Sequence, residues 1–117
     1  MADRLDEITE RLRAFVTERE WAQFHDPKNL AMAVASEAGE LLAEYRWIAN
    51  ADADVWSLQP DNKQRVAMEA ADVGIALLLL CDRVGVDLVG AMAEKIERNA
   101  RNYPVSLSKG RHSRPNS

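Results

Sequence analysis

The sequence predicts an all-α fold, a four-helix bundle-like chain. Glycine and proline are scarce, with five and four among 117 residues, while alanine, leucine and glutamate are plentiful, and this composition is typical of helices. Apolar residues recur at intervals of three and four along four segments, which aligns them on one face of a helix. We find no convincing strand.

The four expected helices cover about residues 3–20, 30–48, 61–84 and 88–102. Pro27 and Asn29 supply a turn and a cap before the second helix. Residues 49–60 are expected to form a loop, which ends where the third helix starts. Gly85 ends the third helix, because glycine adopts the left-handed conformation at low cost. The fourth ends before Pro104, since a residue that precedes proline avoids helical geometry.

Chain length and charge predict one domain, residues 1–104, followed by a flexible basic tail, residues 105–117. The domain carries 19 acidic and 12 basic side chains, and the tail has three basic and no acidic ones. An acidic body argues against nucleic-acid binding, which needs a broad basic surface. The role of the tail is left open.

The sequence also predicts a cytoplasmic protein that does not interact with membranes. No apolar run reaches the roughly 18 residues that a spanning helix needs. The first residues are charged and helix-periodic, unlike a signal peptide. Cys81 is the only cysteine, and we expect it to be a buried thiol in a reducing compartment.

Five carboxylates lie on or beside the apolar stripes of the second and third helices. Glu37 projects inside the stripe of the second helix, and Glu40 and Glu44 border it. Glu69 lies on the stripe of the third helix, with Asp72 at its edge. The stripes themselves are formed by Leu30, Val34, Leu41 and Ile48, and by Val73, Ala76 and Leu80. The alternative is that these carboxylates lie on a solvated face.

Carboxylates on an inward face require a positive partner. A buried, uncompensated carboxylate costs several kcal/mol, and converging like charges raise one another's pKa. Oxygen donors alone suit Mg²⁺ or Mn²⁺. A di-iron bundle would use Glu-x-x-His pairs, and His25 and His112 lie outside any such motif. The pattern therefore favours a divalent hard cation.

The fourth helix carries a second candidate group. Lys95, Asn99 and Tyr103 recur every four residues and so share one face. Lys95 can bind a phosphate, and the amide of Asn99 can donate or accept a hydrogen bond. The alternative is a solvated helix end, where a basic residue is favoured by the helix dipole.

These motifs together resemble one family. The pairs S-E-A-G-E and E-A-A-D are similar to the ExxE…ExxD metal motif of the all-α, MazG-like nucleoside triphosphate pyrophosphohydrolases. The flanking blocks resemble the dCTP pyrophosphatase branch, and the resemblance covers about residues 11–104. The blocks are EREWAQFHDPKNL, EAGELLAEYRW and K-x-x-x-N-x-x-x-YP.

The resemblance implies a reaction and a metal set. Glu37, Glu40, Glu69 and Asp72 would be the catalytic carboxylates and would bind Mg²⁺, with Mn²⁺ as a possible substitute. The implied reaction is hydrolysis of a nucleoside triphosphate, dCTP or a modified dCTP, to the monophosphate and pyrophosphate. A carboxylate not fully engaged with metal would take a proton from water; Glu40 and Glu44 both remain candidates.

The resemblance also implies a substrate-binding set: Trp21, His25, Trp47, Lys95, Asn99 and Tyr103. A flat indole suits stacking on a pyrimidine, so the two tryptophans would wall the base pocket. Lys28 and Arg46 are further candidates for phosphate contact. Trp56 is expected to be a lid or packing residue.

Two departures from the family pattern limit these expectations. Ser36 stands where many members carry another glutamate, so the number of metal ions is left open. Ala76 stands where the branch often has tyrosine, which would enlarge or reshape the pocket for sugar and base. The same reaction on a non-cytosine or damaged nucleotide is therefore an alternative. A non-catalytic helical module that holds a basic partner in its acidic groove is another.

Size and resemblance together predict a homo-oligomer, with a tetramer ahead of a dimer. A bundle this short, with an acidic groove on one side, has little core of its own. The leucines of DVGIALLLLCDRVGVDLVG would supply the interface.

Overall fold

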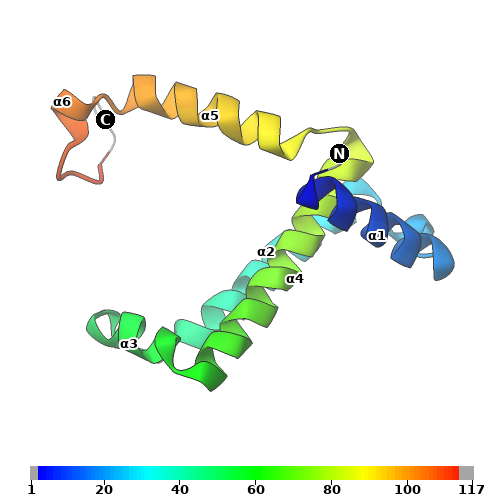
Figure 1. Ribbon diagram of the computed structural model, residues 1–117, viewed down its shortest axis with the longest axis horizontal. Helices are drawn as coiled ribbons and strands as arrows, with labels where there is room; N and C mark the ends of the chain where they lie inside the picture. Colours follow the sequence, from blue (N-terminus) through cyan, green and yellow to red (C-terminus); the bar gives the residue numbers. More distant parts are fainter. Residues whose placement is uncertain (1–2, 114–117) are drawn as a thin grey trace. The chain divides into compact units, whose positions relative to one another are not determined.

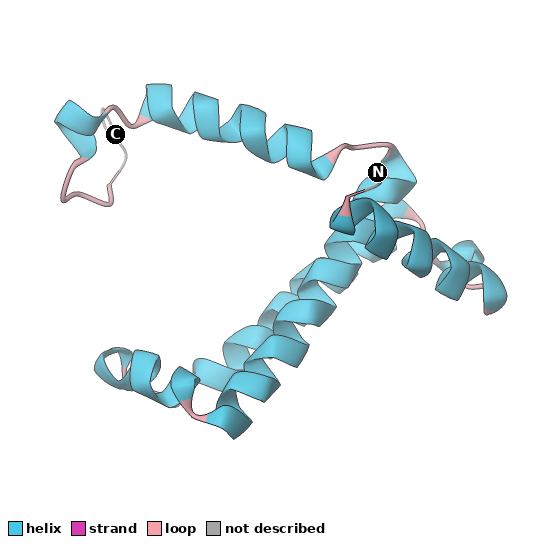
Figure 2. Ribbon diagram, viewed as in Figure 1, coloured by secondary structure: helices cyan, strands magenta, loops and turns pink. Residues whose placement is uncertain are grey.

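The computed structural model describes residues 3–113, and every regular element in that range is helical (Figure 2). The all-α prediction is therefore confirmed. The helices are α1 (Arg4–Glu18), α2 (Pro27–Tyr45), α3 (Ala53–Leu58), α4 (Pro60–Val84), α5 (Leu88–Asn102) and α6 (Val105–Ser108), with 3-10 turns η1 (Ala22–Phe24) and η2 (Asn50–Asp52). None of the helices within residues 3–113 is long and apolar enough to cross a membrane.

The described residues fall into two compact units that meet in the sequence at Gly85. Gly85 has a φ of 74° and caps α4 in the left-handed conformation, as the sequence predicts. The first unit contains α1 to α4, and the second contains α5 and α6. The domain boundary at residue 104 stays a prediction.

Helices α2 and α4 form the centre of the first unit and lie side by side (Figure 1). The start of α2 differs from the expected one at residue 30. Pro27 is inside the helix, at its first turn, and the Asp26 side chain caps it by accepting from the N–H of Asn29 at 2.9 Å. Proline suits this position because the first N–H groups of a helix have no internal partner. The helix ends at Tyr45, three residues before the predicted end.

The prediction of a loop over residues 49–60 was wrong, because this segment contains η2 and the short helix α3. Tertiary contacts stabilise α3. The Tyr45 hydroxyl lies 2.7 Å from the Ser57 hydroxyl, and the ring of Tyr45 meets Trp56 edge-on at 5.2 Å between centroids. Asn62 donates from Nδ2 to the carbonyl of Trp56 at 3.0 Å. Trp56 is thus a packing residue between α2 and α4.

An ion pair attaches α1 to the end of α4. Arg13 donates from Nε to the two carboxylate oxygens of Asp82 at 3.0 and 3.1 Å, and it also pairs with Glu10. The hydrogen bond with Arg13 lowers the pKa of Asp82, and the same bond raises the pKa of Arg13. Val16, one turn further along α1, is buried.

Because the pKa of Asp82 is lowered in the folded state, its contribution to stability is fully present above the ordinary value of 3.8 and is lost progressively as the pH falls from there through the lowered pKa. We expect Asp82→Asn to lower the unfolding temperature at pH 7 by about 5 °C or less, as for other partly exposed pairs. The difference should disappear in the most acidic buffers. Thermal unfolding followed by circular dichroism at pH 7 and pH 3 checks this, and an equal loss at both pH values would contradict it.

The core of the described chain is small. Only Val16, Leu30, Ala76 and Cys81 are buried among the apolar residues of that part. Large side chains remain exposed, including Phe24 at 61%. Burial of apolar surface stabilises a fold by about 25 cal/mol for each Å² removed from water, so the apolar surface that stays exposed adds nothing to the stability of the single chain.

The second unit begins with α5, which is capped by the Asp87 side chain accepting from the N–H of Gly90 at 3.2 Å. Tyr103 ends the helix, and its N–H donates to the carbonyl of Asn99 at 2.7 Å. The segment predicted as a flexible basic tail starts with one helical turn, α6. Its last residues, 114–117, lie outside the described range.

Candidate metal centre

Three of the predicted metal ligands converge in the first unit. Glu37 on α2 and Glu69 and Asp72 on α4 can each place one carboxylate oxygen within 4.8 Å of the others. The two glutamates are half-buried and Asp72 is exposed. The convergence follows from the sequence, because residues three apart on α4 share a face and that face lies against α2.

The charges around Glu69 show that the other predicted carboxylates are also close. Partial burial raises the pKa of Glu69, and the negative charges of Asp72, Glu40, Glu44 and Glu37 raise it further. Each of these carboxylates makes ionised Glu69 less favourable, so a proton or a cation is attracted to this position. Glu40 is exposed and does not belong to the group of three.

The donor set of this group fits a hard cation. All three side chains offer oxygen, and no histidine or cysteine joins them among residues 3–113. Carboxylates from two helices can hold a divalent ion that prefers oxygen ligands. The residues present therefore fit a metal centre.

Arg65 is a residue of this region that the sequence analysis missed. It donates from Nε to Oε2 of Glu44 at 3.1 Å, and the Glu44 side chain is only 20% exposed. Arg65 lies four residues before Glu69, on the same face of α4, and this spacing is the signal that could have revealed it. Of the two candidate proton acceptors, Glu44 thus has a basic partner, and Glu40 has none within the described residues.

A pocket of about 310 Å³ adjoins the carboxylates. Glu37 and Asp72 line one part of it, and His25 and Asn29 line another. Ala76, the departure from the family pattern, also lines it and is only 6% exposed. The structure therefore brings a predicted substrate-binding residue, His25, into one pocket with two predicted metal ligands.

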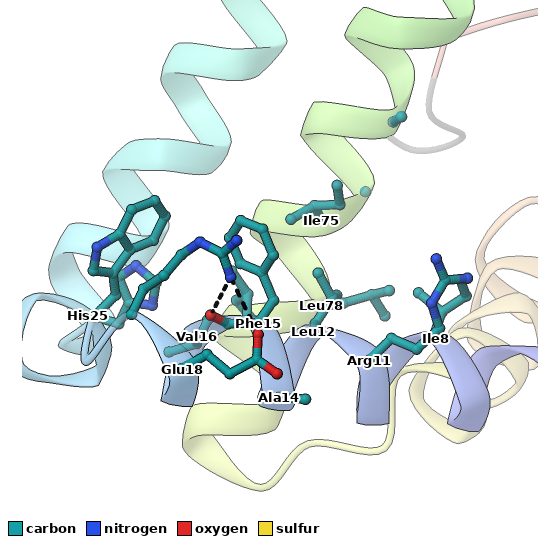
Figure 3. A pocket seen from close by; sticks show the side chains of 15 residues that line it. Ile8, Arg11, Leu12, Ala14, Phe15, Val16, Glu18, His25, Ile75 and Leu78 are labelled. Atoms are coloured by element: carbon teal, nitrogen blue, oxygen red, sulfur yellow. Dashed lines mark hydrogen bonds and ion pairs between the residues drawn. The ribbon is translucent and has the colours of Figure 1, made fainter.

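A larger cavity of about 850 Å³ lies between α1 and α4 (Figure 3). Its walls are mainly apolar side chains such as Phe15, Ile75 and Leu78, and none of the three converging carboxylates lines it. Trp21 lies here, edge-on to Phe15 at 5.6 Å between ring centroids. His25 lines this cavity as well as the smaller pocket. We take the smaller pocket as the candidate site because only it combines apolar walls with the carboxylates.

Two other predicted residues of the first unit, Trp47 and Lys28, do not line this pocket. Trp47 follows the end of α2 and is 85% exposed, and the guanidinium of Arg46 lies 5.4 Å from its ring centroid. Lys28, at the start of α2, is exposed. The three residues of the fourth-helix motif are exposed on α5 and at its end, in the second unit, and their relation to the carboxylates stays a prediction; they are Lys95, Asn99 and Tyr103.

Comparison of the sequence with known proteins finds a matching family model and related proteins. Residues 32–115 match the model of the MazG-like family. dCTP pyrophosphatase 1 of Rattus norvegicus is 38% identical over 106 residues, which are 91% of this chain and 62% of that protein. The protein of the same name from Homo sapiens is 34% identical over 105 residues, covering 90% of this chain and 62% of that protein.

Among solved structures, a pyrophosphatase from Archaeoglobus fulgidus matches with a TM-score of 0.81 and 36% identity. The match covers 89% of this chain and 95% of the archaeal chain. By contrast, this chain spans only about 62% of the length of the curated relatives.

Proposed function

This chain belongs to the MazG-like family, and from that membership we propose that it is a nucleoside triphosphate pyrophosphohydrolase that releases the nucleoside monophosphate and pyrophosphate. The observation that carries the proposal is the convergence of Glu37, Glu69 and Asp72 beside a pocket that contains His25. The 38% identical relative is named for dCTP, and we propose dCTP or a modified dCTP as the substrate. Such an enzyme would remove unwanted nucleotides from the cellular pool.

We assign metal binding to Glu37, Glu40, Glu69 and Asp72, with Mg²⁺ as the ion and Mn²⁺ as a possible substitute. Partial burial raises the pKa of Glu69 and the charges of the neighbouring carboxylates raise it further; a cation would neutralise those charges, which supports the assignment. A bound Mg²⁺ supplies charge neutralisation at triphosphate oxygens and orientation of a water molecule. Glu37 on α2 and Glu69 and Asp72 on α4 would hold the ion.

We propose Glu40 as the group that takes the proton from the attacking water. Glu44 is the weaker candidate because its Oε2 already accepts a hydrogen bond from Arg65 at 3.1 Å. Glu40 is exposed and close enough for its charge to act on Glu69. Because a carboxylate has two oxygens, Glu40 would bind the ion through one of them and accept the proton from water through the other.

We propose that His25 contacts the nucleoside in the 310 Å³ pocket and that Trp21 and Trp47 stack on the base. Trp47 lies more than two helical turns beyond Glu37, each turn being about 5.4 Å, so a second copy of the chain is the better source of this ring. Lys95, Asn99 and Tyr103 complete the proposed set of substrate contacts from the second unit.

We propose a homo-oligomer, with a tetramer ahead of a dimer. The small core and the exposed apolar side chains of the described chain support assembly, since a subunit interface would remove them from water. The net charge of −4 gives no reason to add nucleic acid as a partner. The buried free thiol of Cys81 is compatible with a cytoplasmic location.

Ala76 favours a second candidate substrate. Its small side chain lines the pocket beside the carboxylates, where a bulky side chain would reduce the space for sugar and base. The same reaction on a non-cytosine or damaged nucleotide is therefore the alternative.

A panel of dNTPs, NTPs and modified dCTPs with Mg²⁺, with products resolved by anion exchange, tests the proposal. We expect monophosphate plus pyrophosphate, with dCTP or a modified dCTP turned over best. Preference for another base would support the alternative substrate. Stepwise release of orthophosphate would contradict the reaction, and no turnover by folded protein would favour a non-catalytic module.

A further inference from the structure

Arg65 is held in place beside the metal carboxylates but is not used by the reaction described above. Its Nε donates to Glu44 at 3.1 Å, and its guanidinium carbon lies 5.9 Å from the centroid of the Trp56 ring. Within residues 3–113 neither of its Nη nitrogens donates a hydrogen bond. The side chain is 58% exposed, so four N–H groups remain open to a ligand.

The order of groups along the α2–α4 pair indicates what that ligand would be. On α4 the pocket residue Ala76 comes last, Asp72 and Glu69 precede it, and Arg65 precedes Glu69 by four residues, about 6 Å along the helix. These four residues share one face of the helix. A nucleotide with its nucleoside in the pocket and its phosphates at the carboxylates would therefore extend its terminal phosphates toward Arg65.

On α2 the same order holds in the reverse chain direction. Asn29 lines the pocket, Glu37 belongs to the carboxylate group, and Glu44 follows two turns later, where it holds Arg65. Since the bond to Glu44 uses Nε, the Nη groups keep their fork-like geometry for phosphate oxygens.

We propose that Arg65 binds the two terminal phosphates of the substrate, which leave as pyrophosphate, while Glu44 fixes the position of its guanidinium. The proposal rests on the function proposed above for the same site. It adds a substrate-binding residue that faces the leaving group rather than the nucleoside.

Titration calorimetry of inorganic pyrophosphate with Mg²⁺ tests the proposal without requiring turnover. We expect Arg65→Gln to raise the Kd for pyrophosphate by about 10-fold or more, the effect of losing hydrogen bonds to a charged group. The Kd for dCMP should not change, because the monophosphate occupies the opposite end of the site. The Kd of Arg65→Lys for pyrophosphate should lie between those of the wild-type protein and Arg65→Gln, since an ammonium keeps the charge but lacks the forked pair of donors.

Two further variants separate phosphate binding from a purely structural role. Lys63→Gln removes one positive charge from another face of α4 and should leave both Kd values unchanged. In the single variant Arg65→Gln, Glu44 loses its partner. The unpaired negative charge of Glu44 would then repel pyrophosphate even if Arg65 had never touched it. The double variant Glu44→Gln/Arg65→Gln has no unpaired carboxylate. We expect it to bind pyrophosphate as weakly as the single variant.

The outcomes are distinct. Recovery of pyrophosphate binding in the double variant, or equal loss of dCMP binding in Arg65→Gln, would overturn the role of Arg65. Wild-type protein that does not bind pyrophosphate would overturn it as well. Wild-type protein that binds pyrophosphate through Arg65 but turns over no nucleotide would support this anion site and contradict the proposed function.

Discussion

Glu69→Gln is expected to reduce kcat/KM by at least about 100-fold while leaving the helical content unchanged, because the substitution removes one of the proposed metal ligands. The shape of the side chain is retained, so packing between α2 and α4 should not suffer. Steady-state kinetics with saturating Mg²⁺, together with far-ultraviolet circular dichroism, measures both parts.

The same substitution should raise the unfolding temperature of the metal-free protein at neutral pH. The pKa of Glu69 is raised in the folded state by partial burial and by neighbouring carboxylates, so folding is disfavoured once this group ionises. The cost is absent below the ordinary value of 4.5, where the group is protonated in both states, and it is fully present above the raised pKa. The gain in Tm should therefore be seen at pH 7 and should vanish near pH 4.

Glu97→Gln is the matched control, since it removes one carboxylate from an exposed position of α5. We expect it to change neither kcat/KM nor the unfolding temperature appreciably. If Glu69→Gln retained wild-type turnover, the assignment of Glu69 as a metal ligand would be wrong.

Removal of divalent metal is expected to abolish turnover completely and reversibly. Chelation followed by addition of Mg²⁺ should restore activity, and Mn²⁺ should substitute, because both ions prefer carboxylate oxygen. Turnover that persists in excess chelator would contradict metal dependence. The measurement is pyrophosphate release before chelation, after chelation and after each ion is returned.

Binding of the ion should also appear in the stability of the protein. At a Mg²⁺ concentration of 100 times its Kd, a ligand that binds only the folded state stabilises it by about 2.7 kcal/mol. Because protons compete for Glu69, whose pKa is raised, this stabilisation should weaken as the pH falls through that pKa. Glu69→Gln should show a much smaller shift with Mg²⁺, and Lys63→Gln should show the wild-type shift.

The sequence alone was sufficient for the bounds of two long helices, α4 and α5. Expected bounds of about 61–84 and 88–102 agree with α4 (Pro60–Val84) and α5 (Leu88–Asn102) because periodicity, proline at the start and Gly85 at the end are local signals. The meeting of Glu37 with Glu69 and Asp72 was also predictable, since each lies on or beside an apolar stripe and such stripes face one another.

Only the tertiary structure decided the features that depend on contacts between distant residues. The short helix α3 has little stability of its own, and it forms where Tyr45 and Asn62 bond to it from α2 and α4. The Glu44–Arg65 pair spans two helices, so the spacing within α4 places Arg65 on the face of Glu69 but does not identify Glu44 as its partner. The shared position of His25 between the small pocket and the larger cavity likewise depends on how η1 and α2 pack on α4. Periodicity fixes which face of a helix is apolar, whereas the partner of each side chain on that face is set by packing between elements.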